Sequence, residues 1–439
     1  MKRSCVVALF SLALAAAPAE SQVLLSQTTW GAAGRDAANG VAVAADGSSY
    51  VVGTSDSFAT DQFGQPQAGI ALVKFAPDGS LVWQRVWNGT TIGGFLQGPG
   101  VGLGADGSVY VTGTTGTNGG DAVLLKFDPS GTLVWQRTWG GSSNEVSNAV
   151  AAASDGSVYI TGTTQSFGAS GFGLFIVKFN AAGSVVWQKI WDGAQGVAIA
   201  IAPDGTVCAA GSMSRPPGIG NFDVLILKIT AAGAVVWQRT YSAGDVVDAR
   251  GGMTVAADGS VYIAGALQAP KMGFVDLAVL VVKLTPAGAL AFDTQWGGKG
   301  GDDATGVAVA PDSTIYIAGT SGSFGAGLGD PFVLHLQATG RSLDATTWGG
   351  TGADEGAGVG VAADGTVVLA ATVSAPPYSL LTAPRKTSMV KSTMAVPVGT
   401  LVDVVATVAD PQAPVILSNG GTTFGGNVDV ALVRIRPAP

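Results

Sequence analysis

The chain has very little cysteine and histidine. Of its two cysteines, Cys5 lies in an N-terminal leader, so Cys208 alone remains and no disulfide framework can form. We expect Cys208 to be a small buried apolar residue. His335 is the only histidine, which excludes histidine-based catalytic triads and zinc sites built from several histidines. Stability must therefore come from burial and from strand pairing.

Charged residues are also scarce, at 12% of the chain, and the 30 acids outnumber the 22 bases. The resulting net charge of −8 repels phosphate groups. We therefore expect no nucleic-acid partner and no binding to an anionic membrane surface. Beyond the first residues, no apolar run is long enough for a transmembrane segment.

The N-terminus has the pattern of a signal peptide. Lys2 and Arg3 precede an apolar stretch from 5 to 17 that is too short to span a bilayer, and Ala17-Pro18-Ala19 fits the small-x-small cleavage rule. Nothing resembling a lipoprotein motif surrounds a later cysteine. We therefore expect residues 1–19 to be removed and the mature chain to be secreted or periplasmic, and possible attachment at the cell surface stays open.

What the chain has in abundance is glycine, with 66 residues, and a regular spacing of aromatic residues. Tryptophans at 30, 87, 139, 191, 296 and 348, with Tyr241 between the fourth and fifth, are separated by 57, 52, 52, 50, 55 and 52 residues. A period near 50 residues indicates one supersecondary unit repeated around an array.

Each unit contains four short apolar runs and a strong hairpin signal. In residues 101–139 the first two runs flank Asp106-Gly107, and the last two flank a second turn at 128–131. Four antiparallel strands form one blade of a β-propeller. The hairpin aspartate recurs seven times, so we predict an all-β, seven-bladed propeller over residues 20–439, with turns at Asp46, Asp106, Asp155, Asp204, Asp258, Asp312 and Asp364.

The two ends of the chain complement each other. The last repeat stops after a third strand at 428–436, whereas residues 23–30 align on Trp30 with the fourth strand at 132–139. We predict that the N-terminal strand closes the last blade, because the sheet edge would otherwise be left unpaired.

The repeat resembles the bacterial SBBP-type β-propeller repeat. The matching elements are W-G-G-x-G-x-D at 296–302, D-G-S-V-Y-V-T-G-T at 106–114 and D-A-V-L-L-K-F at 121–127. The resemblance covers nearly all of the mature chain and implies a propeller of an exported or surface protein. It implies no catalytic motif.

Acidic residues recur six positions after the terminal tryptophan, in the connections between blades. Oxygen-rich loops of this kind can hold calcium, although no D-x-D-x-D-G loop is present, and turn capping explains the same acids without a metal. Both interpretations stay open for Asp36, Glu145, Asp302 and Asp354.

The first strands, which line the channel of a propeller, consist almost wholly of alanine, glycine and valine, as in 41–45, 199–203 and 307–311. A channel-centred enzyme would need acids, bases or metal ligands there. The sequence therefore predicts no enzyme and no cofactor, apart from the calcium hypothesis.

One segment interrupts the repeat inside blade seven. Residues 374–421 form an insertion that carries Arg385, Lys386 and Lys391. An insertion that does not recur in the other repeats is a frequent place for a function specific to one protein. We expect this insertion on the face of the acidic loops, where the three basic residues could bind a partner. An insertion without any role explains it equally well.

We therefore predict a monomeric, exported, non-enzymatic binding or scaffold propeller whose loop face binds an unknown protein or glycan. The alternatives are an exported hydrolase or lyase acting on polysaccharide through acids such as Asp302 and Asp354, and a purely structural surface protein.

Overall fold

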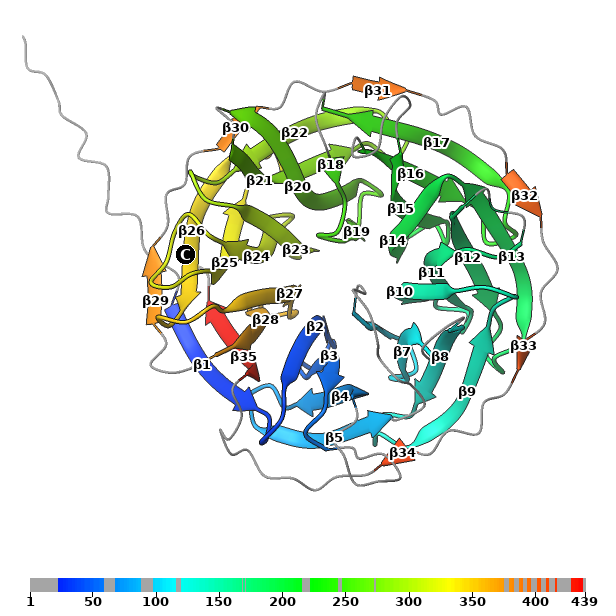
Figure 1. Ribbon diagram of the computed structural model, residues 1–439, viewed down its shortest axis with the longest axis horizontal. Coiled ribbons are helices and arrows are strands. Elements are labelled where there is room, and N and C mark those ends of the chain that lie inside the picture. Colours follow the sequence, from blue (N-terminus) through cyan, green and yellow to red (C-terminus); the bar gives the residue numbers. More distant parts are fainter. Residues whose placement is uncertain are drawn as a thin grey trace, which may run out of the picture.

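The described residues form seven sheets arranged in a ring around a central axis (Figure 1). The computed structural model describes residues 23–58, 68–87, 98–115, 120–167, 169, 171–214, 222–243, 247–271, 274–374, 379–382, 387–389, 393–395, 401–403, 408–409, 415–416 and 428–436. No helix occurs among these residues. The fold is thus the predicted seven-bladed β-propeller.

Each blade is a meander of antiparallel strands that runs from the axis outward. Blades one to three consist of β2 (Asp36–Val43), β3 (Ser49–Ser55), β4 (Gly69–Phe75) and β5 (Leu81–Trp87); β6 (Gly100–Leu103), β7 (Val109–Thr114), β8 (Ala122–Phe127) and β9 (Leu133–Trp139); and β10 (Glu145–Ala152), β11 (Val158–Thr164), β12 (Gly173–Phe179) and β13 (Val185–Asp192).

Blades four to six follow the same order, except that the inner strand of blade five is in two pieces. They consist of β14 (Ala194–Ile201), β15 (Val207–Ser214), β16 (Phe222–Ile229) and β17 (Val235–Ser242); β18 (Val247–Asp248), β19 (Met253–Val255), β20 (Val261–Lys271), β21 (Phe274–Leu284) and β22 (Leu290–Trp296); and β23 (Asp302–Val309), β24 (Ile315–Ser321), β25 (Asp330–Leu336) and β26 (Ser342–Gly349).

Blade seven joins the two ends of the chain, as predicted. Its strands are β27 (Glu355–Val361), β28 (Val367–Val373), β35 (Asp429–Arg436) and, outermost, β1 (Val23–Trp30). The register pairs Val23 with Arg436 and Trp30 with Val430. The N-terminal strand thereby satisfies the backbone groups along the edge of β35 and closes the ring.

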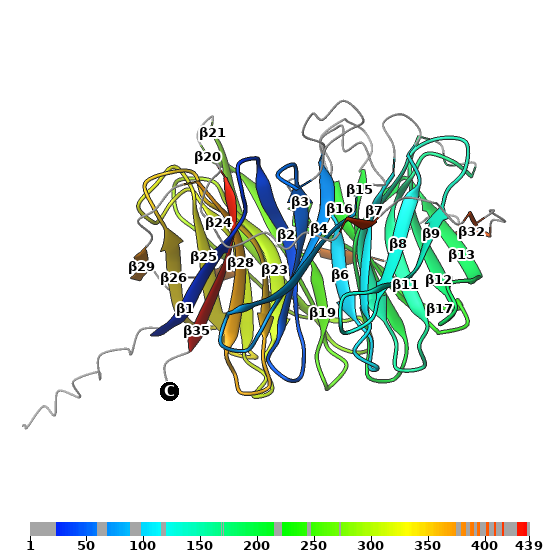
Figure 2. The same cartoon turned by 90° about the horizontal axis from the view of Figure 1, so that it is seen from below.

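The hairpin between the first two strands of each blade depends on one local conformation. In blade one, Gly47 has φ +82° and donates its N–H to the carbonyl of Ala44, while Asp46 Oδ1 accepts the N–H of Ser48 at 2.8 Å. Glycine takes this left-handed conformation at no steric cost, and Ser313 takes it in blade six with φ +71°. Figure 2 shows these hairpins together at the lower end of the ring, which we call the turn face.

Neighbouring blades are joined by buried hydrogen bonds between their outer strands. The indole N–H of Trp87, at the end of β5, donates to Gln136 Oε1 in the middle of β9 at 2.9 Å. The same bond recurs at other junctions, and at the blade four to five junction the donor is a tyrosine hydroxyl. The donors and acceptors are Trp30 and Gln84, Trp139 and Gln188, Tyr241 and Asp293, and Trp348 and Gln27. The terminal aromatic residues of the repeat thus fix each blade to the next.

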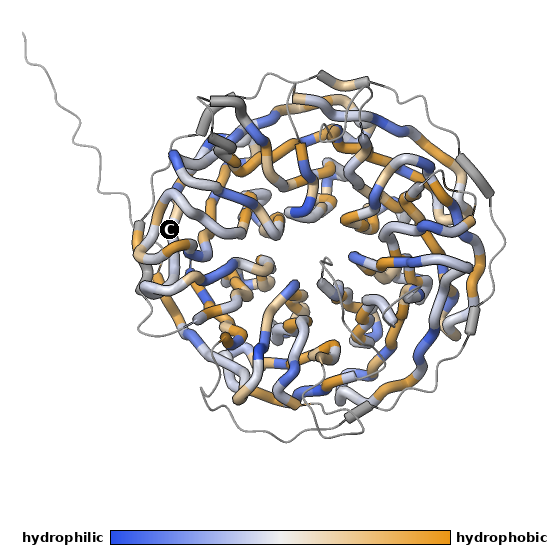
Figure 3. Tube along the Cα trace, viewed as in Figure 1, coloured by the Kyte–Doolittle hydropathy of each residue, from blue (hydrophilic) through white to orange (hydrophobic). Residues whose placement is uncertain are grey.

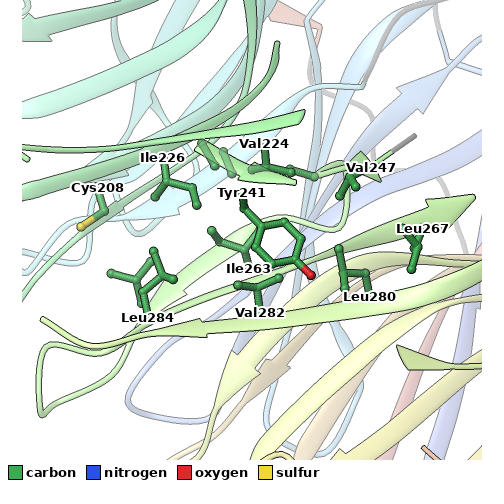
Figure 4. Close-up of a cluster of buried hydrophobic side chains, with 14 of the residues drawn as sticks. Cys208, Val224, Ile226, Tyr241, Val247, Ile263, Leu267, Leu280, Val282 and Leu284 are labelled. Atoms are coloured by element: carbon green, nitrogen blue, oxygen red, sulfur yellow. The ribbon is translucent and has the colours of Figure 1, made fainter. Parts of the chain in front are cut away.

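The apolar core lies between blades. One cluster combines Cys208 and Ile226 of blade four with Ile263, Val282 and Leu284 of blade five (Figure 4). Apolar residues recur in the same way along the strands of every blade (Figure 3). Cys208 is fully buried, and this burial raises its pKa to about 12, so the thiol packs as an apolar side chain, as expected.

The short strands that the structure describes between β28 and β35 lie on the outer rim of the ring. These six strands each pair antiparallel with the outermost strand of a different blade, from blade six back to blade one (Figure 1). They are β29 (Ser379–Thr382), β30 (Thr387–Met389), β31 (Thr393–Ala395), β32 (Leu401–Asp403), β33 (Val408–Ala409) and β34 (Val415–Ile416). The expected position on the loop face is therefore wrong for these strands. Outer strands offer unpaired backbone groups along the rim, and short extended pieces satisfy them.

The bond between Trp87 and Gln136 provides a test of the junctions. We expect Gln136→Leu to lower the free energy of unfolding by about 1–3 kcal/mol, because it leaves the buried indole N–H of Trp87 without its acceptor. In a Trp87→Phe background the same change should lower the free energy of unfolding by clearly less, because the indole N–H donor is already absent. Urea unfolding of the two single variants and the double variant measures this coupling. Strictly additive losses would contradict it.

Candidate functional site

The four recurrent acids are buried at the end of the ring opposite the turns, which we call the loop face. Asp302 shows how they are used. Its Oδ2 accepts the N–H of Gly298 at 2.8 Å and the hydroxyl of Ser323 at 2.6 Å, and its Oδ1 accepts the hydroxyl of Ser321 at 2.5 Å. The carboxylate therefore holds the connection between β22 and β23 and the end of β24 together.

The other three acids make equivalent bonds. All four are 0% exposed, and each accepts the backbone N–H of the residue four positions earlier. The further donors to these three are the hydroxyl of Ser57 for Asp36, that of Thr164 for Glu145, and the N–H of Ser374 for Asp354. Each of the four carboxylates thus caps a turn. Among the described residues, no three or more His, Cys, Asp or Glu side chains gather as metal ligands.

A second motif completes these caps and was missed from the sequence. Serine followed by phenylalanine occurs at 57–58, 166–167 and 323–324, in the loop after the second strand. The serine hydroxyl accepts a backbone N–H from the neighbouring inter-blade connection, as Ser323 does from Gly300 at 2.8 Å. The phenylalanine ring lies over the terminal tryptophan, with centroids 5.1 Å apart for Phe58 and Trp30. The repeated Ser-Phe pair is the sequence pattern from which this second cap could have been predicted.

A basic residue recurs on the third strand of each blade, and near the turn face its side chain has contacts within the repeat. Lys126 Nζ lies 5.3 Å from the ring centroid of Tyr110 and 3.7 Å from Asp106 Oδ2. His335 fills the same slot in blade six, where it stacks on Tyr316 at 4.3 Å and contacts Asp344 Oδ2 through Nδ1 at 3.0 Å. These contacts are structural, so the chain's only histidine is part of the repeat.

A further set of carboxyl groups faces three of the capping acids. Asp121, Asp330 and Asp429 stand at the start of third strands, and burial raises the pKa of each, with a smaller contribution from the capping acid of the next blade. The pKa of Asp429 rises to about 6 through burial and through the nearby charge of Asp36. Each pair approaches the glycine after a terminal tryptophan, namely Gly140, Gly349 and Gly31.

The most distinctive polar group lies on blade five, where the repeat is irregular. The inner strand is interrupted between β18 and β19, and the intervening loop carries Arg250, whose side chain is 62% exposed. Its Nε lies 2.5 Å from Asp248 Oδ2, and Asp248 Oδ1 accepts the hydroxyl of Ser212 at 3.2 Å. Asp303, on the inner strand of blade six, completes what we call the channel-mouth cluster: Ser212, Asp248, Arg250 and Asp303.

Asp303 has the most perturbed environment in this cluster. Its pKa is raised to about 6, mainly by burial and also by the negative charge of Asp248, while Arg250 partly offsets both. Its Oδ1 is buried and has no hydrogen-bond partner among the described residues. Asp303 directly follows the capping Asp302 in the sequence, and its position there does not distinguish it from other acids of the blade connections. The signal that could have identified the cluster was the irregular inner strand of blade five.

Blade five also has a long hairpin on the loop face. Its second and third strands pair as far as Lys271 and Phe274, and each has 11 residues, so these two strands are longer than the described strands of the other blades. Figure 2 shows the labelled ends of β20 and β21 at the upper side of the ring. The two irregular features of blade five therefore belong to the same face.

The opposite end of the channel is apolar. The described residues there enclose a cavity of about 510 Å³, lined mainly by alanine and valine from blades one, five, six and seven, such as Ala44, Val255 and Ala362. Asp258 and Lys283 supply charge at its edge. The three predicted partner-binding residues, Arg385, Lys386 and Lys391, lie outside the described residues.

The class that this architecture defines is the seven-bladed β-propeller. No protein-family model matches the chain, and no curated protein sequence matches it. Similar solved structures include the Dos1 propeller, 10% identical with a TM-score of 0.46 over 78% of this chain and 92% of that one. The WD40 domain of Neurospora crassa Pan2 is 10% identical, with a TM-score of 0.47 over 81% and 93% of the two chains. Polysaccharide lyase Uly1 is 11% identical, with a TM-score of 0.47 over 92% and 90%. These similarities concern the fold alone.

No helix long and apolar enough to cross a lipid bilayer is found in the part of the chain that the structure describes.

The raised pKa of Asp303 predicts a pH dependence of stability. Between about pH 4 and pH 6 the folded protein holds a proton that the unfolded chain has lost, so the free energy of unfolding should fall as the pH rises through this window. Asp303→Asn should reduce that fall to the part that Asp429 contributes, and it should be more stable than the parent at pH 7 by about 2 kcal/mol, with no gain at pH 4. Urea unfolding across this range measures the effect.

Glu355→Gln is the matched control, because Glu355 is exposed and occupies the equivalent position of blade seven. It should leave the pH profile of the parent in place. A parent-like profile in Asp303→Asn would show that Asp303 does not carry the buried proton.

Proposed function

We propose that the protein is an exported, non-enzymatic binding or scaffold propeller that takes a protein or glycan on its loop face, at the channel-mouth cluster. The observation that carries this proposal is that the capping acids and the third-strand bases are engaged in contacts of the repeat, whereas Arg250 is 62% exposed and the nearby Asp303 has a buried, unpartnered Oδ1. A few convergent polar groups with a perturbed pKa are typical of ligand sites.

The chemistry of the cluster suits a polar, hydroxyl-bearing partner. The guanidinium of Arg250 contacts Asp248 through Nε, so its other N–H groups can donate to carbonyl, hydroxyl or carboxylate oxygens of a ligand. Asp303 Oδ1 can accept a hydroxyl or amide N–H. A glycan or a polar protein loop supplies both kinds of group.

Export and origin rest on the sequence. The N-terminal pattern around Lys2 and Arg3 and the resemblance to the SBBP-type repeat support a bacterial protein that is secreted or periplasmic, and possibly attached to the cell surface. The leader lies outside the described residues. A monomer is proposed because each blade finds its partners within the one closed ring.

The binding site is tested by Arg250→Ala, with Lys299→Ala as control because Lys299 is exposed in the connection between β22 and β23. We expect Arg250→Ala to weaken binding of a ligand identified on a glycan array, or by capture from the native secretome, at least tenfold. Truncation of an arginine at the centre of a binding site typically weakens the free energy of binding by about 2 kcal/mol. Lys299→Ala should bind as the parent does. Equal affinity of both variants would contradict the proposed site, and failure to find any ligand by either route would favour a purely structural protein.

A second candidate function is a polysaccharide-acting hydrolase or lyase. The observation that favours it is the buried Asp303 with a pKa of about 6, because such a carboxyl can act as a general acid or base near neutral pH. The acids first considered for this role, Asp302 and Asp354, are engaged as caps. Release of reducing ends or of unsaturated sugars from a polysaccharide panel, lost in Asp303→Asn and kept in Glu355→Gln, would favour the enzyme over the binding protein.

A further inference from the structure

The junction where the ring closes contains two buried aspartates from opposite ends of the chain. Asp36 begins β2 of blade one, and Asp429 begins β35 of blade seven. The backbone N–H of Asp36 donates to the carbonyl of Val428 at 3.0 Å, so the two strand starts are held together. Figure 1 shows β2 next to the blade that contains β1 and β35.

Both carboxylates converge on Gly31, which follows the terminal tryptophan of β1. A Cβ built on Gly31 would stand 2.9 Å from Asp36 Oδ2 and nearer still to Asp429 Oδ1. The two carboxylates therefore face each other across the space of about one methyl group. This close approach requires glycine at position 31.

The hydrogen bonds of the pair are incomplete. Asp36 is 0% exposed and Asp429 is 1% exposed. Asp36 Oδ2 accepts the N–H of Ala32 and the hydroxyl of Ser57, but Asp36 Oδ1 and both oxygens of Asp429 have no partner among the described residues. A buried carboxylate pair of this kind is costly unless positive charge compensates it.

The equivalent pair at the junction of blades six and seven differs in one respect. Asp330 Oδ2 accepts the N–H of Gly327 at 2.9 Å, and Asp354 accepts three donors, from Gly350 and Ser374. Both of its carboxylates thus have donors from the chain itself. Asp429 has no such donor among the described residues, so both of its oxygens are open to a further partner.

We propose that Asp36 and Asp429 bind a hard divalent cation of the calcium class across the ring-closure junction. Such ions prefer carboxylate oxygens at about 2.3–2.6 Å, and two oxygens separated by the space of a methyl group can both reach one ion. Water and backbone carbonyls complete the coordination, since calcium takes about 6–8 oxygens. The ion links the N-terminal blade to the last blade and stabilises the closed ring. This inference is independent of the partner on the loop face.

The site can be read out directly, because Trp30 is adjacent to Gly31 and can sensitise terbium luminescence. We expect saturable, tryptophan-excited Tb³⁺ emission from the mature protein that Ca²⁺ displaces. Addition of Ca²⁺ after EDTA treatment should raise the Tm by about 2–4 °C. Asp429→Asn, which keeps the side-chain shape, should lose this emission and the Tm response. Asp330→Asn, the matched variant at the other junction, should keep both.

Three outcomes would overturn the proposal: no saturable Tb³⁺ or Ca²⁺ binding by the parent protein, undiminished binding in Asp429→Asn, or equal losses in both variants. If Asp429→Asn does not fold, the proposal is tested on the parent protein alone, by equilibrium dialysis against Ca²⁺ and by its Tm with and without EDTA. If the Tm of the parent protein does not change with Ca²⁺ but rises on acidification, Asp36 and Asp429 share a proton, and this also contradicts a cation site.

Discussion

The structure depends on the hydrogen bond that joins the outer strand of one blade to the outer strand of the next. An indole N–H such as that of Trp87 reaches Gln136 of the following blade, and apolar clusters fill the space between the sheets. Trp30 makes the same bond from the N-terminal strand to Gln84 of blade one. A strand that contributes only to blade seven therefore also fixes the position of blade one, so the stability of the ring depends on both ends of the chain.

In this construction most of the recurrent charged side chains have structural contacts within the repeat. The turn aspartates cap their own turns, third-strand bases such as Lys126 contact aromatic rings, and the loop-face acids hold the connections between blades. Two irregular places depart from this pattern. One is the channel mouth on blade five, with Arg250 and Asp303, and the other is the closure junction at Asp429. Departure from the repeat, more than residue type, marks the candidate sites.

The repeat made much of the fold predictable. The spacing of terminal aromatics and the Asp-Gly turns predicted seven blades, and the alignment on Trp30 predicted closure by the N-terminal strand, because both depend on local patterns that recur. The rim strands were not predictable, since pieces such as Val408–Ala409 are too short for a periodic pattern and pair only because a neighbouring edge is available. Asp303 and Asp429 could not be singled out in the sequence, because their burial and missing partners arise only when different blades meet.

The central claim is that the N-terminal strand is an integral part of the last blade. Native-state hydrogen exchange of the mature protein, read by mass spectrometry on peptides covering 23–30 and 428–436, tests it most directly. The account predicts that amides of both peptides are protected to the same extent as those of β28 and exchange together with them, in a single cooperative opening. Rapid exchange of 23–30 while 428–436 stays protected would show that the ring closes without this strand and would contradict the account.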